Sequence, residues 1–520
     1  MIRIEKITKK YADQTVLNNI TYHFPQKERI ALVGANGQGK TTLLNAITGQ
    51  DEADQGQIIT PKNFRMAFLP QSFSDTPLPT ILSECISGHE LVYQYKTRMD
   101  DSLKAMETAY SEETFEAYEN ALRLYETHGG YQSEGLAEQV LLGLGFKENQ
   151  LEASPLTLSG GWRMRLEIAK ILVSNPDFII LDEPTNHLDL PSIEWMENYL
   201  LDFKGTLLFV SHDRTFLNNL STITLHLHGG QLREYKGNFD AFLKQKEMMA
   251  LGQEATMKKL EQQKQHMQKF VDRFRAKATK AAQAQSRIKQ IQKIDAVLEN
   301  IPVTDEARTF SLPKLNYPKS GKEVLVTENL AVGYDVLLIQ NIHLRLNRAD
   351  KIGIVGANGI GKSTLLKSVI GDLQPLKGQV RQGTNVCTEF YTQSAAEAIR
   401  SSATVLETLQ RENPVLTNQE QRALLGAFLF KGNDLLKKTN VLSGGERARL
   451  VFACLFGRLP NFILMDEPTN HLDMMSKDIL AEMLRTYPGT LLFVSHDRDF
   501  LESVADDIYE VKDSKLARVI

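Results

Sequence analysis

Short unbroken apolar runs recur in both halves of the chain. The first half contains RIALV, FIILD and LLFV at 29–33, 178–182 and 207–210, and the second contains KIGIV, FILMD and LLFV at 351–355, 462–466 and 491–494. Strands of a parallel sheet have this composition when helices cover both faces of the sheet. An apolar helical segment, TTLLNAITG or STLLKSVIG, follows the first run of each half. The pattern predicts an α/β fold that occurs twice.

The spacing of the shared motifs indicates a tandem duplication with one insertion. GANGQGKTT and GANGIGKST lie 322 residues apart, whereas the two copies of LSGG, DEPTNHLD and LLFVSHDR lie 284 apart. The first copy therefore holds 38 extra residues between Gln71 and Ser159. The best candidate is the segment at about 86–130, which is rich in Glu, Ala, Leu and Met and lacks Pro. This composition predicts a helical hairpin.

A second helical segment separates the two copies. From Leu260 to Ile291, apolar residues recur mostly three and four positions apart, with Lys and Arg around them. This is the pattern of amphipathic helices. We expect a first domain at 1–240 with a helical arm at about 86–130, a basic helical linker at 241–318, and a second domain at 319–520.

The net charge of −4 conceals a strongly basic segment. Between Lys244 and Lys293 there are 13 Lys and Arg residues against 4 Asp and Glu residues. Such a segment in an otherwise acidic chain suggests a polyanionic partner, bound with the salt sensitivity of counterion release. The alternative is a charged helix that is merely solvated. The phenylalanines Phe270 and Phe274 among the basic residues favour contact with nucleic acid.

Composition argues against several other classes of protein. No apolar run approaches the ~20 residues of a membrane span, and the charged start MIRIEKITKKYADQ lacks the apolar core of a secretory signal. The three cysteines, Cys85, Cys387 and Cys454, have no metal-ligand spacing. We therefore expect a cytoplasmic protein with ordinary thiols.

The glycine-rich segments predict two phosphate-binding loops. GANGQGKT and GANGIGKS fit GxxxxGK[ST], each between an apolar run and an apolar helix. Glycines let backbone N–H groups surround phosphates, and the helix N-terminus adds its dipole. Lys40 and Lys362 would contact the β- and γ-phosphates. The candidate phosphate-loop ligands here are Gly34, Asn36, Gly37, Gly39, Lys40, Thr41 and Thr42 in one copy, and Gly356, Asn358, Gly359, Gly361, Lys362, Ser363 and Thr364 in the other.

Polar residues at the ends of the other apolar runs complete the candidate sites. The hydroxyls of Thr41 and Ser363, with the carboxylates of Asp182 and Asp466, would hold Mg²⁺. The expected roles of the remaining residues are polarisation of the attacking water for Glu183 and Glu467, a γ-phosphate contact for His212 and His496, and a catalytic or Mg²⁺ contact for Gln71 and Gln393. Such a site acts on phosphoryl transfer mainly through positioning and charge neutralisation.

With Walker A, Q-loop, LSGG signature, Walker B, D-loop and switch histidine in this order twice, the chain resembles the ATP-binding-cassette superfamily. The resemblance implies an ATPase with two composite sites, in which the domains pair head to tail. One site would join Gly34–Thr42 to Ser443, Gly444 and Gly445, and the other would join Gly356–Thr364 to Ser159, Gly160 and Gly161. Tyr11 and Tyr334 resemble the adenine-stacking aromatics.

Within the superfamily, the soluble tandem organisation, the arm and the basic linker resemble the ABC-F group. That resemblance implies a monomeric translation factor that contacts the ribosome, with its rRNA and tRNA, through the linker and the arm. The open alternatives are a ribosome-protecting antibiotic-resistance member and the ATPase subunit of a membrane transporter. The ribosome-recycling relative is disfavoured because three cysteines cannot ligate two four-cysteine iron–sulfur clusters. One departure is Trp162, where the family usually has Glu or Gln; we expect the ATP site beside it to remain active.

Overall fold

The computed structural model describes residues 2–11, 14–69, 78–186, 188–274, 281–300, 312–392, 402–470 and 472–519. These residues form two compact units. One comprises Met1–Glu234 with Phe310–Ile520, and the other is Tyr235–Thr309. The first unit contains both copies of the repeat, and the second contains the basic segment between them.

A six-stranded sheet lies at the centre of each copy, with the strand orders β5-β6-β7-β3-β8-β9 and β15-β16-β17-β13-β18-β19. Its strands in the first copy are β3 (Arg29–Val33), β5 (Met66–Phe68), β6 (Phe178–Asp182), β7 (Thr206–Val210), β8 (Ile223–His228) and β9 (Gln231–Lys236). Those in the second are β13 (Lys351–Gly356), β15 (Thr388–Tyr391), β16 (Phe462–Asp466), β17 (Thr490–Val494), β18 (Asp507–Lys512) and β19 (Lys515–Arg518).

The central strands β3, β6 and β7 pair in parallel, as do β13, β16 and β17. The strands β7 and β17 are buried along their whole length. This explains their unbroken apolar sequences, since neither face of the strand meets water.

An antiparallel sheet packs beside the central sheet in each copy. It has the order β2-β1-β4 in the first copy, whereas in the second β10 pairs with β11, β12 and β14. The strands are β1 (Arg3–Tyr11), β2 (Gln14–His23), β4 (Gln55–Ile59), β10 (Glu323–Gly333), β11 (Leu337–Ile342), β12 (Arg345–Asn347) and β14 (Lys377–Gln382). One continuous apolar core joins both sheets to the helix after the P-loop, α1 (Lys40–Thr48) or α11 (Lys362–Ile370).

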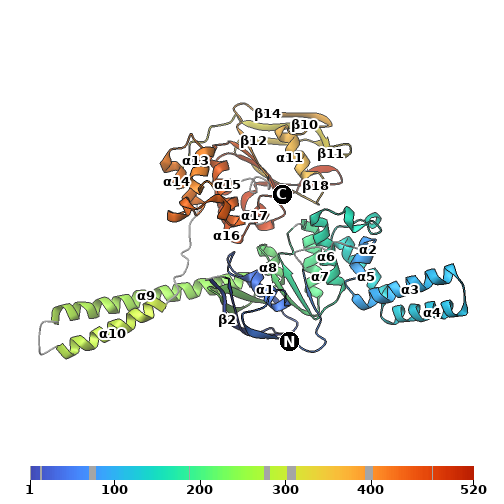
Figure 1. The fold of residues 1–520 in the computed structure, drawn as a ribbon. Helices are drawn as coiled ribbons and strands as arrows, with labels where there is room; N and C mark the ends of the chain where they lie inside the picture. Colours follow the sequence, from blue (N-terminus) through green and yellow to red (C-terminus); the bar gives the residue numbers. More distant parts are fainter. Residues whose placement is uncertain are drawn as a thin grey trace. The chain divides into compact units, whose positions relative to one another are not determined.

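Helices complete each copy. The first copy has α2 (Ile81–Ile86), α5 (Gly130–Gly143), α6 (Gly160–Val173), α7 (Leu190–Asp202) and α8 (Arg214–Leu220). The second has α13 (Val405–Glu412), α14 (Asn418–Ala427), α15 (Gly444–Gly457), α16 (Met474–Thr486) and α17 (Arg498–Val504). The segment that only the first copy contains forms α3 (Glu90–Thr108) and α4 (Glu112–Thr127), which run side by side (Figure 1). Ser111 begins α4 with a capping box to Thr114.

The second unit is a hairpin of two helices, α9 (Phe239–Phe274) and α10 (Ala281–Asn300), which also run side by side (Figure 1). Val271 and Ile291 are buried in it, and Lys264 pairs with Asp295 at 2.5 Å. The apolar positions of the sequence pattern thus give the two helices an interior. The side chains of Phe270 and Phe274 lie outside the described residues. The predicted fold class, α/β with tandem ATPase-type domains, is confirmed.

The buried pair Val271 and Ile291 generates a stability prediction. Replacing both with Ala leaves a void between α9 and α10, and we expect the free energy of local opening to fall by about 2 kcal/mol or more. Hydrogen exchange of the amides in α9 and α10 measures that opening. The matched control replaces the exposed Gln262 and Gln290 with Ala. Equal exchange rates in the two double variants would show that the hairpin is not held by this core.

Candidate functional site

The two P-loops take a backbone conformation that only glycine adopts readily. Gly37 and Gly39 have φ values of 78° and 97°, and Gly359 and Gly361 have 77° and 108°. A Cβ atom on Gly39 would lie 2.4 Å from Val16 Cγ1. Each loop leads directly into its helix, so its backbone N–H groups and the positive end of the helix dipole converge.

A buried lysine occupies each loop. Lys40 Nζ donates to the carbonyl of Gly34 at 2.8 Å, and Lys362 Nζ donates to those of Gly356 and Ala357, both at 2.9 Å. Burial lowers the pKa of both lysines, although nearby carboxylates such as Glu183 and Glu467 oppose this effect. A cation held among carbonyl oxygens in this way can attract a polyphosphate.

A hydroxyl and a carboxylate meet beside each lysine. Thr41 Oγ1 donates to Asp182 Oδ2 at 3.0 Å. Burial raises the pKa of Asp182 and of Asp466, while the hydroxyls of Thr41 and Ser363 partly offset that rise. Among the described residues, the buried Asp466 Oδ1 has no hydrogen-bond partner. Two oxygen donors of this kind, one of them unsatisfied, fit Mg²⁺.

The second acid of each pair, Glu183 or Glu467, sits in the left-handed backbone region with φ of 52° or 47°. Its N–H donates to the last residue of the adjacent strand, Val210 at 2.9 Å or Val494 at 3.0 Å. Burial, with the neighbouring Asp adding to it, raises the pKa of each glutamate to about 7. Strain and a raised pKa at the end of a strand are typical of a residue retained for chemistry.

Each glutamate faces a histidine. His212 Nε2 lies 3.4 Å from Glu183 Oε1, and His496 Nε2 lies 3.2 Å from Glu467 Oε1. Burial, together with the P-loop lysine, lowers the pKa of each histidine to about 3. The imidazoles are therefore neutral near pH 7, and the contact is not a permanent ion pair.

The first site is a cavity of about 330 Å³ lined by residues of the first copy, among them Tyr11, Lys40, Glu183 and His212. The Tyr11 hydroxyl donates to Asp51 Oδ2 at 2.5 Å, which fixes the ring beside the P-loop. Tyr334, directly after β10, is exposed.

The second site is a cavity of about 270 Å³ whose walls come from both copies. Its lining residues are Ser159, Gly161, Trp162, Arg165 and Leu188 of the first copy, with Asn358, Gly359, Glu467, Asn470 and His496 of the second. The structure thus brings the first signature to the second P-loop.

The first cavity, in contrast, is lined by residues of its own copy. The lining of the first cavity includes none of Ser443, Gly444 and Gly445, and the nearest side chains around Gly445 belong to its own copy. From the second copy, the charge of Asp473 acts on Lys40 and on His212. Gln71 and Gln393 lie outside the described residues.

Trp162 changes the start of the signature helix. In α15, Ser443 and Glu446 form a capping box, with Glu446 Oε2 accepting from Ser443 N at 2.8 Å. Trp162 has no acceptor for this bond, and Ser159 makes no side-chain cap in α6. The first N–H groups of α6 are therefore left for a ligand rather than for a side chain of the chain itself.

Trp162 also packs into a line of contacts that crosses the domain interface. Its ring lies edge-on to Phe146 at 4.9 Å and 4.5 Å from the guanidinium of Arg165. Arg165 is fully buried and lies 3.4 Å from Asp189 Oδ2, which accepts from Asn358 N in the second P-loop at 2.8 Å. The sequence motifs by themselves do not mark Arg165 and Asp189 as site residues. The repeat contained the signal, because both recur 284 residues later as Arg449 and Asp473.

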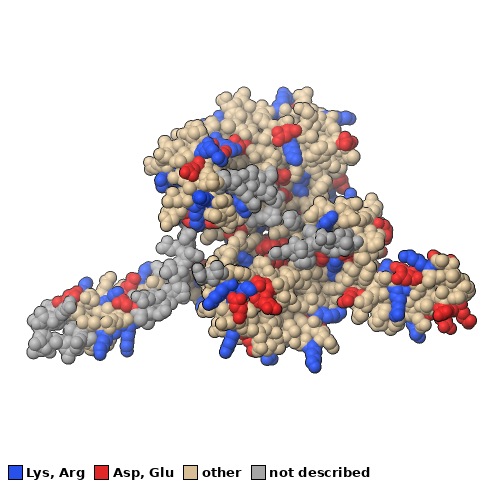
Figure 2. All heavy atoms as spheres, in the orientation of Figure 1, with Lys and Arg blue, Asp and Glu red and all other residues tan. Residues whose placement is uncertain are grey.

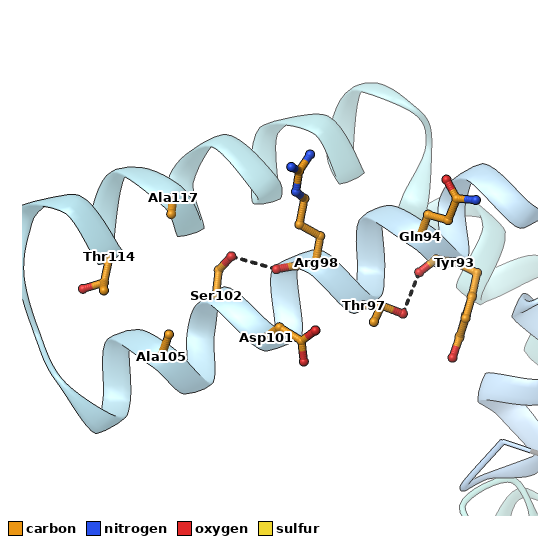
Figure 3. A pocket seen from close by; sticks show the side chains of 9 residues that line it. All are labelled: Tyr93, Gln94, Thr97, Arg98, Asp101, Ser102, Ala105, Thr114 and Ala117. Atoms are coloured by element: carbon orange, nitrogen blue, oxygen red, sulfur yellow. Dashed lines mark hydrogen bonds between the residues drawn. The ribbon is translucent and has the colours of Figure 1, made fainter.

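A larger groove, of about 570 Å³, lies between the arm helices α3 and α4. Figure 3 shows its lining side chains, including Tyr93, Arg98 and Asp101, with the small residues Ala105 and Ala117 between the helices. No predicted nucleotide ligand lines it. The hydroxyls of Thr97 and Ser102 donate back to their own helix, so this groove is not a candidate ATP site.

Comparison with known proteins agrees with the geometry. The family model described as ABC transporter matches residues 17–186 and 339–470, and a second model of the same description matches residues 225–312. The putative ATP-binding protein YdiF of Bacillus subtilis is 39% identical over 99% of this chain and 80% of its own length. The ABC transporter F family member 2 of Arabidopsis thaliana is 33% identical over 99% of this chain and 77% of its own length.

Solved structures resemble the chain in fold. One titled RNase-L Inhibitor matches with a TM-score of 0.62 and 20% identity, over 97% of this chain and 87% of its own length. An archaeal ribosome recycling factor, in complex with a ribosomal stalk protein, matches with a TM-score of 0.59 and 20% identity over the same shares.

Two P-loop domains with paired acids, switch histidines and an LSGG helix define a tandem ATP-binding-cassette ATPase. The chain belongs to the ABC transporter family and, within it, to the ABC-F group. It is an ATPase, as predicted. Within the part of the chain that the structure describes, no helix has the length and apolar character to cross a membrane.

The raised pKa values of Glu183 and Glu467 predict a pH-dependent cost in stability. A carboxyl whose folded pKa exceeds its unfolded value stabilises the fold below the unfolded pKa, and this stabilisation is lost as pH rises through about 7. We therefore expect the double variant Glu183→Gln with Glu467→Gln, without nucleotide or Mg²⁺, to be more stable than wild type at about pH 8. Its free energy of unfolding, measured by urea denaturation, should be higher by on the order of 1 kcal/mol per site. The difference should shrink at about pH 5. A wild type that is the more stable at the higher pH contradicts the prediction.

Trp162 generates a second prediction, that the site facing Ser159 is active. Lys40→Ala disables the first P-loop and leaves this site intact, so we expect phosphate release to continue at about half the wild-type rate. Lys362→Ala gives the reverse comparison. If Lys40→Ala abolishes turnover while Lys362→Ala retains it, Trp162 marks a degenerate site.

Proposed function

We propose that the chain binds and hydrolyses two ATP molecules at composite head-to-tail sites, and that the resulting closing and opening of its domains acts on the ribosome as a translation factor. The basic helical hairpin would contact tRNA and rRNA. The observation that carries the proposal is this hairpin, a separate unit of helices inserted between two ATPase domains. We further propose that the protein is cytoplasmic and acts as a monomer.

The site geometry supports specific roles in hydrolysis. Lys40 and Lys362 bind the β- and γ-phosphates, and Tyr11 supports the adenine. Thr41 with Asp182, and Ser363 with Asp466, hold Mg²⁺, which supplies charge neutralisation on the phosphates. Glu183 and Glu467 orient the attacking water, and the neutral His212 and His496 contact the γ-phosphate. Gln71 and Gln393 are proposed to complete the Mg²⁺ contacts.

Contacts between the domains support the switch. Asp189 of the first copy accepts a hydrogen bond from Asn358 N of the second P-loop at 2.8 Å. A nucleotide that moves the P-loop therefore acts directly on the partner domain. Binding of ATP favours the closed pair, and loss of the γ-phosphate releases it, as in other two-state elements biased by that phosphate.

Charge distinguishes the two helical extensions. The segment from Lys244 to Lys293 has 13 basic and 4 acidic residues, which suits the phosphate backbone of RNA. The arm helices α3 and α4 have 4 basic and 9 acidic residues, and Figure 2 shows acidic side chains gathered at the outer end of the arm. We therefore propose that the arm meets a basic protein surface of the ribosome rather than bare RNA.

A similar solved structure agrees with this setting. It is a model of ribosome-bound archaeal Pelota and ABCE1, with a TM-score of 0.54 and 19% identity. At this identity the similarity shows a shared fold. Ribosome binding by this chain is therefore part of the proposal. The competing functions are antibiotic resistance by protection of the ribosome and a role as the ATPase subunit of a membrane transporter.

The proposal is tested by co-sedimentation with ribosomes. With ATP, Glu183→Gln with Glu467→Gln should trap the closed state and pellet with ribosomes, because binding is retained while turnover is lost. Without ATP it should stay in the supernatant. No ATP-dependent pelleting would contradict ribosome binding, and raised drug tolerance on overexpression would favour the resistance function.

The hairpin's role is tested on that trapped variant. Lys269, Lys289 and Lys293 are exposed on α9 and α10, and their joint replacement by Gln should weaken ribosome binding about tenfold and flatten its salt dependence by about 2 in log–log slope. The matched control replaces the exposed Lys62, Lys147 and Lys377 of the ATPase domains with Gln. If the two triple variants weaken ribosome binding equally, the hairpin lysines contribute no more to binding than other surface lysines do.

A further inference from the structure

Lys477 of α16 reaches from the second copy into the first. Its Nζ donates to the main-chain carbonyl of His212 at 3.1 Å and to Asp497 Oδ2 at 2.5 Å. The side chain is 18% exposed. A single ammonium group therefore joins the two domains at a point well removed from bulk water.

Both partners of Lys477 belong to switch-histidine segments. His212 faces Glu183 at 3.4 Å in the first site. Asp497 directly follows His496 of the second site, and it caps α17 by accepting from Phe500 N at 3.0 Å. Moving one domain against the other would therefore pull on the carbonyl of His212.

Charge keeps Lys477 protonated and places it near the first site. Burial lowers its pKa, but Asp497, Asp213 and Glu183 outweigh this effect and raise it overall. In return, the charge of Lys477 lowers the pKa of Glu183 against the larger effects of burial and Asp182. A residue of the second domain thus supplies a cation to the active-site carboxylate of the first.

The second site has no equivalent of this lysine. The offset of 284 residues makes Ile193 its counterpart, a buried apolar residue of α7. Other contacts in the interface do have counterparts. Arg214 pairs with Asp478 at 2.6 Å, and Arg498 lies 4.0 Å from Glu194 at the equivalent positions. Lys477 therefore breaks the symmetry of an otherwise paired interface.

We propose that Lys477 is a positioning residue for ATP hydrolysis at the first P-loop, through which this site responds to the position of the second domain, whereas the second P-loop site has an isoleucine, Ile193, at the equivalent position. The inference rests on the roles proposed for Glu183 and His212. The two ATP sites would then differ in how strongly domain closure controls them.

The test separates the sites with Glu→Gln backgrounds. In Glu467→Gln, which leaves the first site active, Lys477→Ile copies the residue of the other repeat. It should lower kcat about tenfold while KM for ATP changes less than about twofold. Lys477→Arg should keep at least about half of kcat, because a guanidinium can also donate to the carbonyl and pair with Asp497. In Glu183→Gln, which leaves the second site active, Lys477→Ile should change kcat by less than about twofold.

A matched control removes a neighbouring contact between the domains. Arg214→Met breaks the pair with Asp478 without touching the carbonyl of His212, and it should leave kcat of the first site within about twofold. The inference is overturned if Lys477→Ile has no effect on the first site, lowers both sites equally, or matches Arg214→Met. Wild-type hydrolysis by Glu183→Gln with Glu467→Gln would instead overturn the proposed roles of the glutamates.

Discussion

At the carboxyl edge of each six-stranded sheet, a lysine, two carboxylates and an imidazole share a space largely closed to water. Lys40, Asp182, Glu183 and His212 are all substantially buried, and each has a pKa displaced from its ordinary value. Burial is the largest cause in every case. These groups are held close together by the buried strands, by the glycines in the left-handed backbone region and by the strained backbone of the glutamates. In water, the same charged groups would be solvated separately. The cluster costs stability in the empty protein and becomes favourable when phosphates and a cation occupy it.

The two copies use the same elements but are not equivalent. The second P-loop lines a cavity together with the first signature, whereas the cavity of the first P-loop is lined by its own copy. Two substitutions between the copies accompany this difference. Trp162 replaces a capping glutamate in the first copy, and Lys477 replaces an isoleucine in the second. The line from Trp162 through Arg165 and Asp189 ends at the second P-loop, and Lys477 ends at the first site. Each site thus has its own connection to the opposite domain.

Much of the fold and of the candidate site could be predicted because its signals are local. The strands at Arg29–Val33 and Phe178–Asp182 coincide with the apolar runs, and the P-loop lysines begin their helices as the motif requires. Arg165, Asp189 and Lys477 could not be assigned in this way. Their roles depend on partners such as Asn358 and His212, which lie 169 and 265 residues away along the chain.

The sequence by itself determined that the chain contains two P-loop ATPase domains, a helical arm and a basic helical hairpin, because periodicity and glycine placement act over a few residues. Only the tertiary structure decided which side chains line each cavity and which of them cross between the domains. These outcomes depend on how two folded surfaces meet. A cation such as Lys477 has the same sequence signature on a solvated helix as at a buried interface. Burial and a carbonyl at 3.1 Å from its ammonium group separate the two cases.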